Sequence, residues 1–296
     1  MPEIIVPATS ANMGPGFDSL GLAVNLYLKV RIGKQSDQWT VHHPFGKRVP
    51  TDEKNMIVLS ALTVDANIQP HEIFVKTEVP LARGLGSSSS AIIAGLMLGN
   101  ELSESVHLTR QQILDRAVKI EGHPDNVSPA IFGGIVVGGP DPQTSGNFLI
   151  YQIDTPSDYV PIAVIPKREL ATSESRDVLP VNLNRKQAVR NNAESSLLLA
   201  ALFKHDWNNV VKLLESDQFH EIYRAKLVPE LEIVRNLCHS LGIFGSYLSG
   251  AGTTVMLLVK KDQTDSLLDQ LNKSEKLQDC QIKLLEFDLS GARISE

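Results

Sequence analysis

Hydrophobic and polar residues alternate in several short stretches of the chain, which predicts strands that bury one face. The most regular of these stretches is AVNLYLKVRI (23–32), and IIVPA (4–8) and HEIFVKTEV (71–79) also have strand character. The runs PAIFGGIVVGG, NFLIYQI and VPIAVIP are short, apolar and broken by Gly and Pro, and we interpret them as further strands. Residues 42–54 are polar and predict a loop.

Longer stretches between these strands are compatible with helices. They cover residues 55–68, a segment that starts at 87, and residues 108–122, 185–206, 206–216, 228–242 and 262–273. Thr109 and Gly122 suit the N-cap and C-cap positions of the third helix. Two strand-like pieces about a glycine turn (246–260) and a last strand (281–289) complete the pattern. The order predicts an α+β architecture with two lobes, divided near residues 155–180.

Composition narrows the class of protein. The chain has 296 residues, of which 42% are hydrophobic and 21% charged, enough for a substantial core. A net charge of −6 argues against a nucleic-acid surface. Two cysteines indicate no disulfide framework and fit a reducing compartment. The N-terminus lacks a signal-peptide pattern, and the longest apolar run (91–99) is too short for a bilayer. We expect a soluble, cytoplasmic protein with no nucleic-acid or membrane partner.

The strongest chemical signal is PLARGLGSSSSA (80–91), a glycine turn that leads into four serines and a helix. Gly84 and Gly86 permit a backbone with positive φ, and a helix start offers unpaired N–H groups and partial positive charge. Phosphate is the favoured ligand of such a turn. A Walker A loop would need a Lys that is missing here, and the third glycine of a dinucleotide fingerprint is replaced by Ser89. The simpler alternative is an ordinary capped helix after a tight turn.

A second glycine-rich segment, PATSANMGPGFDSLGLA (7–23), carries Thr9, Ser10, Asn12, Asp18 and Ser19 on a backbone bent by Gly and Pro. Only Met13 and Phe17 in its loop suit a core. The segment is either a ligand-binding loop or a surface turn held by local side-chain bonds.

A third polar segment is KIEGHPDNVSPAIFGG (119–134). Glu121 ends the predicted helix, and we place His123, Asp125 and Asn126 in the turn after it. A carboxylate and a serine hydroxyl would suit Mg²⁺, whereas His123 alone is a weak metal signal. An Asx turn at a strand start is the alternative.

Two further features are less specific. The turn GSYLSGAGTTV (245–255) suits either phosphate support or tight loop packing. Arg176 and Arg224 lie in polar surroundings, where they are either solvated surface residues or a fork for a substrate carboxylate.

With these motifs assembled, the chain resembles the GHMP kinases, a family that includes galactokinase, homoserine kinase and mevalonate kinase. PLARGLGSSSSA looks like the family's ATP-phosphate loop, and the 7–23 and 121–134 segments look most like its homoserine kinase members. GSYLSGAGTT is similar to the C-terminal glycine motif, with Thr253 where Pro is usual.

The resemblance implies a two-lobed fold with a ribosomal-protein-like, ATP-binding N-terminal domain (1–158) and a ferredoxin-like C-terminal domain (159–296). It also implies ATP-dependent, Mg²⁺-assisted phosphorylation of the side-chain hydroxyl of L-homoserine, on the route to threonine. A homodimer is one option, since family members are often dimers.

By motif position, the resemblance assigns residues to each part of the site. Asn55 would contact adenine, and Ser88 and Glu121 would hold Mg²⁺ and act in catalysis with Asn126. The triphosphate would lie on Pro80, Leu81, Ala82, Arg83, Gly84, Leu85, Gly86, Ser87, Ser88, Ser89 and Ser90. The amino-acid pocket would comprise Asn12, Asp18, His123, Asn126, Thr172, Arg176 and Arg224.

Physical chemistry agrees with this assignment. Asp18 suits the ammonium of homoserine, and Arg176 and Arg224 suit its carboxylate. Asn126 can orient the hydroxyl but cannot take its proton, so we expect catalysis mainly by positioning and electrostatics. The alternatives are a kinase of the same family for another small alcohol, such as mevalonate, and a nucleotide-binding regulator without catalysis.

Overall fold

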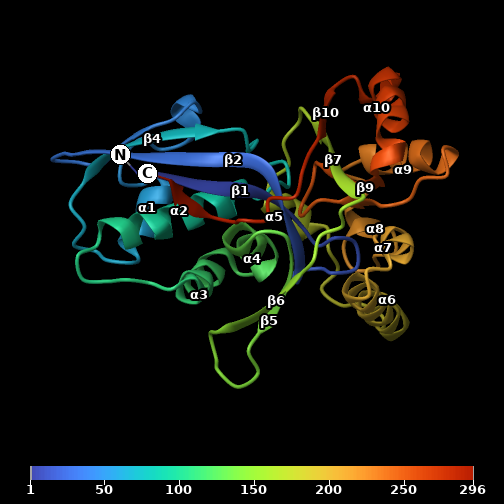
Figure 1. Cartoon of the computed structure of the whole chain (residues 1–296), viewed down its shortest axis with the longest axis horizontal. Coiled ribbons are helices and arrows are strands. Elements are labelled where there is room, and N and C mark those ends of the chain that lie inside the picture. Colours follow the sequence, from blue (N-terminus) through green and yellow to red (C-terminus); the bar gives the residue numbers. More distant parts are fainter. Residues whose placement is uncertain (1, 296) are drawn as a thin grey trace.

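The computed structural model describes residues 2–295, which form two β-sheets flanked by helices in two lobes (Figure 1). The first sheet has strand order β11-β1-β2-β4-β3, with β5 paired to β2 and β6 paired to β5. The second sheet has the order β10-β7-β9-β8. The strands are β1 (Glu3–Ala11), β2 (Leu20–Gln35), β3 (Thr40–His42), β4 (His71–Thr77), β5 (Ile135–Pro140), β6 (Phe148–Ile153), β7 (Tyr159–Pro166), β8 (Ser246–Leu248), β9 (Val255–Lys260), β10 (Cys280–Leu284) and β11 (Arg293–Ser295).

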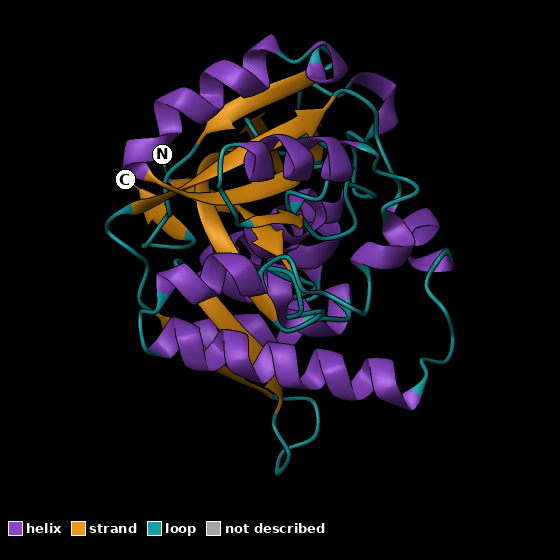
Figure 2. Ribbon diagram, turned by 90° about the vertical axis from the view of Figure 1, so that its right-hand side faces the viewer, coloured by secondary structure: helices purple, strands orange, loops and turns teal. Residues whose placement is uncertain are grey.

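The helices occupy three places around these sheets (Figures 1 and 2). The helices α1 to α4 cover one face of the first sheet, α9 and α10 lie on the second sheet, and α6 to α8 lie below it in Figure 1. Their bounds are α1 (Met56–Leu62), α2 (Ser87–Leu102), α3 (Arg110–Glu121), α4 (Pro124–Phe132), α5 (Thr172–Asp177), α6 (Arg185–Phe203), α7 (Trp207–Leu213), α8 (Glu221–Arg224), α9 (Glu230–Ser240) and α10 (Thr264–Lys273), with 3-10 turns η1 (Gly46–Arg48), η2 (Lys261–Gln263) and η3 (Glu275–Leu277).

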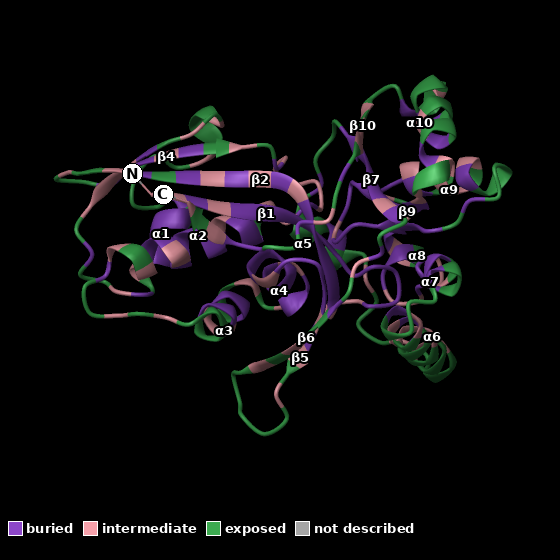
Figure 3. Cartoon of the chain, viewed as in Figure 1, coloured by how far each residue is buried: buried purple, intermediate pink, exposed green. Residues whose placement is uncertain are grey.

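Alternation along β2 explains how the first sheet is built. Leu26, Leu28 and Val30 are buried under the helices, while Tyr27 and Lys29 between them reach the other face. By contrast, β7 is buried on both faces, because α9 and α10 cover one side and the first lobe with α6 and α7 covers the other. Its VPIAVIP sequence is accordingly apolar without alternation. Figure 3 shows this buried centre, with exposed residues concentrated on α6 and the outer loops.

The α+β prediction and most elements are confirmed, including Thr109 and Gly122 as caps of α3. The interpretation of the segment after Gly122 was wrong: Pro124–Phe132 is a helix, so Asp125 and Asn126 lie in its first turn and not in a turn before a strand. The strand part of PAIFGGIVVGG begins only at Ile135. The helix expected over 55–68 ends at Leu62, and the last predicted strand ends at Leu284.

The last strand of the chain pairs with the first. Strand β11 pairs with β1, so both termini lie side by side at the edge of the first sheet (Figure 1). The second sheet starts with β7 at Tyr159, close to the expected division at 158/159, which remains a prediction. Within residues 2–295, no helix is long and apolar enough to span a bilayer.

Candidate functional site

The glycine-serine loop lies between β4 and α2 at the junction of the two lobes. Gly84 and Gly86 both adopt left-handed backbone conformations, with φ of 74° and 68°, as the sequence predicts. Gly86 is the N-cap of α2, and the first helical bond runs from the Ser90 amide to the Gly86 carbonyl at 2.8 Å. The amides of Ser87 to Ser89 therefore precede the helical ladder and are free to bind an anion.

The side chains of this loop have different environments. Ser87 is half-buried and Ser88 exposed, while Leu85, Ser89 and Ser90 are buried. The Arg83 guanidinium donates to the carbonyls of Leu81, Pro166 and Lys167, so it fastens the loop to the second lobe. Of the residues assigned to the triphosphate, Ala82, Gly84, Gly86, Ser87 and Ser88 line the hollow in front of the helix. The loop therefore offers backbone amides and two serine hydroxyls to this hollow, while its cationic side chain, Arg83, is bonded elsewhere.

Two adjoining hollows share Ala82, Ser87 and Ser88. One is largely apolar, with a volume of about 370 Å³, and is lined by Leu28, Phe45, Asn55, Met56, Val75, Val79, Leu81 and their neighbours. Its apolar lining suits an aromatic base. Asn55 caps α1: its Oδ1 accepts from the Ile57 amide at 3.0 Å, and its Nδ2 donates to the Pro50 carbonyl at 2.7 Å.

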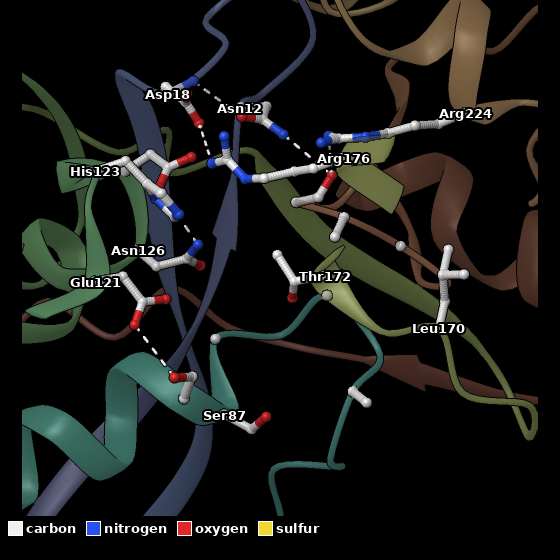
Figure 4. Close-up of a pocket in the computed structure, with 18 of the residues that line it drawn as sticks. Asn12, Asp18, Ser87, Glu121, His123, Asn126, Leu170, Thr172, Arg176 and Arg224 are labelled. Atoms are coloured by element: carbon white, nitrogen blue, oxygen red, sulfur yellow. Dashed lines mark hydrogen bonds and ion pairs between the residues drawn. The ribbon is translucent and has the colours of Figure 1, made fainter. Parts of the chain in front are cut away.

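The other hollow is polar and brings together all seven residues assigned to the amino-acid pocket (Figure 4). Asn12, Asp18, His123 and Asn126 come from the first lobe, and Thr172, Arg176 and Arg224 from the second.

The loop between β1 and β2 is bent at non-glycine residues. Asn12, Met13 and Asp18 all have positive φ, a conformation that costs energy in side-chain-bearing residues. Asn12 holds the bend, because its Nδ2 donates to the Gly250 carbonyl at 3.1 Å and its Oδ1 accepts from the Asp18 amide at 3.1 Å. Asp18 Oδ1 pairs with Arg176 Nη2 at 3.0 Å across the hollow.

Arg224 is not a surface residue, since only 2% of it is exposed. Its Nε donates to the Ser175 carbonyl at 3.1 Å and its Nη1 to the Gly250 carbonyl at 3.0 Å. Burial and the nearby charge of Arg176 lower the pKa of Arg224 to about 10, so it stays cationic at neutral pH. None of the acceptors that hold this buried cation is an anion, so it is poised for an anionic ligand.

The start of α4 supplies a carboxylate–imidazole pair. His123 Nδ1 lies 2.5 Å from Asp125 Oδ1. Burial opposes protonation of the imidazole, but the bond to Asp125 and the negative charges of Asp125, Asp18 and Glu121 outweigh it and raise the pKa of His123. Asn126 Oδ1 accepts from the buried Thr9 hydroxyl at 2.8 Å, which fixes the amide with its Nδ2 as the donor.

Glu121 faces the first turn of α2. Its two carboxylate oxygens accept from Ser88 Oγ at 3.2 Å and from Ser89 Oγ at 3.0 Å. The Ser88 hydroxyl and this carboxylate form an all-oxygen set next to the free amides, which fits Mg²⁺. A separate group, Asp18, His123 and Asp125, also places potential ligand atoms within 4.8 Å of one another. Its position opposite Arg176 suits an ammonium group equally well.

Several lining residues were not identified as binding residues from the sequence. Phe17 was expected to fill a core, but it lines the hollow with the Arg224 guanidinium carbon 5.4 Å from its ring centre. Leu170 and the turn Gly250–Gly252 line the opposite wall, so the glycine turn of the second lobe does contact the site. Thr172, at the start of α5, and Arg176 are exposed at its rim.

Family models match both lobes of the chain. The GHMP kinases N terminal domain matches residues 55–134, and the GHMP kinases C terminal model matches residues 198–277.

Full-length relatives agree with these matches. The chain is 45% identical to a homoserine kinase of Lactiplantibacillus plantarum over 100% of both chains. It is also 45% identical to a homoserine kinase of Lactococcus lactis, with 99% of each chain covered. A solved structure from Listeria monocytogenes, provisionally named homoserine kinase, matches with a TM-score of 0.87 and 36% identity over 100% of this chain and 99% of that one. The chain therefore belongs to the GHMP kinase family, within its homoserine kinase branch.

Proposed function

We propose that the protein transfers the γ-phosphoryl group of ATP to the side-chain hydroxyl of L-homoserine. The observation that carries this proposal is the position of the phosphate-binding helix start between an apolar hollow and a polar one, with Ser87 and Ser88 in both linings. This order matches the order of groups in the reacting complex: base, triphosphate, acceptor hydroxyl, and then the charged end of the amino acid.

Charge complementarity supports an amino-acid acceptor. The Asp18 carboxylate provides negative charge for an ammonium group, and Arg176 and Arg224 provide positive charge for a carboxylate. An Asp18–Arg176 pair that closes on itself at 3.0 Å would open as the zwitterion inserts its own two charges. Mevalonate could use the arginines but has no ammonium for Asp18, so it fits this pocket less well.

Catalysis in this site relies on positioning. The amides of Ser87 to Ser89 would hold phosphate oxygens. Thr9 fixes the Asn126 amide, whose Nδ2 donates one hydrogen to Asp125 Oδ1 at 3.4 Å and has a second for the substrate hydroxyl. Asn126 has no basic atom to accept the hydroxyl proton, and the route that we propose for this proton is to an oxygen of the transferred phosphoryl group. Ser88 and Glu121 would hold Mg²⁺, which would neutralise charge on the phosphates.

A coupled ADP-release assay tests the proposal. With purified protein, we expect ADP production with L-homoserine that depends on Mg²⁺, and much less with mevalonate. Equal turnover of mevalonate would favour the alternative kinase, and absence of ADP with any amino-acid alcohol would favour a regulator. Action in the cytoplasm and assembly as a homodimer remain predictions, which cell fractionation and light scattering would test.

A further inference from the structure

A fully buried imidazole lies directly behind the site. His220, just before α8, has no exposed surface and does not line the hollow. Its Nε2 lies 3.2 Å from the Gly14 carbonyl oxygen, and its Nδ1 lies 3.4 Å from Arg224 Nη1. It therefore connects the first-lobe loop that carries Asp18 to the second-lobe arginine.

The contacts of this imidazole fix its tautomer. A carbonyl oxygen can only accept, so the bond to Gly14 requires the proton on Nε2. The Asp217 carboxylate, 3.8 Å from Nε2, favours the same position for the proton. Nδ1 then presents a lone pair to the Arg224 guanidinium, which can only donate. A neutral imidazole with this orientation is an acceptor for Arg224 and adds no charge of its own.

The guanidinium of Arg224 is restrained on several sides. Ser175 and Gly250 accept from it, and Phe17 lies under it and stacks on the His220 ring at 5.2 Å between ring centres. Among residues 2–295, no protein group accepts a hydrogen bond from Nη2 of Arg224, so this donor remains for a ligand. Its direction depends on the three acceptors and the Phe17 ring that hold the rest of the fork.

We infer that His220 is a positioning residue for recognition of the substrate carboxylate. It holds the Arg224 guanidinium in the orientation that presents Nη2 to the carboxylate. Through its bond to the Gly14 carbonyl, it also holds the loop that presents Asp18 to the ammonium. The inference rests on the proposed function, because it specifies how the proposed amino-acid pocket is preorganised. His220 itself does not touch the substrate.

Two nearly isosteric substitutions separate the two bonds of the imidazole. The amide of His220→Asn ends near the position of Nδ1 and can still accept from Arg224, whereas the amide of His220→Gln reaches toward Gly14 and loses the acceptor for Arg224. In H220Q we expect KM for L-homoserine to rise about tenfold, the effect of losing one hydrogen bond to a charged group, with kcat and KM for ATP nearly unchanged. In H220N we expect most of the affinity to be retained.

His107→Gln, at an exposed position between α2 and α3, is the matched control and should leave all kinetic constants unchanged.

Calorimetric binding of L-homoserine and of its methyl ester, which lacks the carboxylate charge, completes the test. The inference predicts that H220Q weakens binding of L-homoserine but not of the ester. Equal KM for L-homoserine in H220Q and wild type, or equal loss for both ligands, would overturn it. Thermal denaturation identifies a variant that has simply lost its fold, and H220N then carries the comparison. If the wild type does not phosphorylate L-homoserine at all, the proposed function fails instead.

Discussion

Gly86→Ala is the substitution for which the structure gives the sharpest expectation. A Cβ at this position would lie 2.1 Å from Thr9 Oγ1 and 3.2 Å from Asn126 Oδ1. The first distance is more than 1 Å shorter than an ordinary contact, and Thr9 cannot easily move, because it is β-branched and fully buried in β1. The added methyl group must therefore displace the hydroxyl that holds the Asn126 amide.

The magnitude has two parts. A left-handed conformation costs an L-residue roughly 1–2 kcal/mol. Loss of the Thr9–Asn126 hydrogen bond, 2.8 Å long, adds about 1 kcal/mol. We expect unfolding free energy to fall by about 2–3 kcal/mol, and kcat to fall by about 10²-fold as Asn126 and the Ser87–Ser89 amides lose alignment.

A matched control isolates the contact from the backbone strain. Gly242 has φ of 71°, nearly that of Gly86, and a Cβ there would meet nothing within 4 Å. Gly242→Ala should therefore lose only the 1–2 kcal/mol of strain and keep full activity. Urea denaturation and ADP release measured on both variants give the comparison. If G86A and G242A were equally active, the helix start would not form the phosphate site as described.

Three further predictions concern other parts of the site. Arg224→Met should raise KM for L-homoserine by at least about 10²-fold and lower the unfolding free energy by about 1–3 kcal/mol, because the Ser175 and Gly250 carbonyls lose their buried donor. Steady-state kinetics and urea denaturation measure the two effects, and an unchanged KM would show that Arg224 does not bind the substrate. Glu121→Gln should raise the Mg²⁺ concentration for half-maximal activity about tenfold, seen by titration at constant nucleotide, and an unchanged requirement would exclude Glu121 as a ligand. The folded-state pKa of His123 lies above its unfolded value, so the stability it contributes is complete below about pH 6.5 and is lost as pH rises through the folded pKa. The gap in unfolding free energy between wild type and His123→Gln should therefore narrow toward alkaline pH, and a gap that widens would contradict the His123–Asp125 pairing.

The conformation of the loop at residues 80–91 could be predicted from the sequence because it depends on local residues. The turn requires a left-handed backbone at two positions, and these positions are Gly84 and Gly86, which adopt this conformation without strain. The serines that follow form the first turn of α2, as the sequence pattern predicts. The polar loop of Asn12 and Asp18 was likewise identified from its composition.

Other features depend on contacts between distant segments and left little trace in the local pattern. The helix α4 was missed because Pro, Asp and Asn together suggest a turn, although Pro at the first helical position is itself a helix signal. Strand β11 is only three residues long and exists through its pairing with β1. Arg224 becomes buried, and Phe17 comes to lie against it, only when the two lobes pack together. The residues next to them in the sequence do not indicate these contacts.

A crystal structure of the protein with a non-hydrolysable ATP analogue, Mg²⁺ and L-homoserine tests the central claim most directly. We predict phosphate oxygens on the amides of Ser87 to Ser89, the substrate hydroxyl beside Asn126, and the substrate carboxylate on Nη2 of Arg224. Triphosphate bound away from the start of α2, or homoserine with its charged groups reversed between Asp18 and Arg224, would contradict the account.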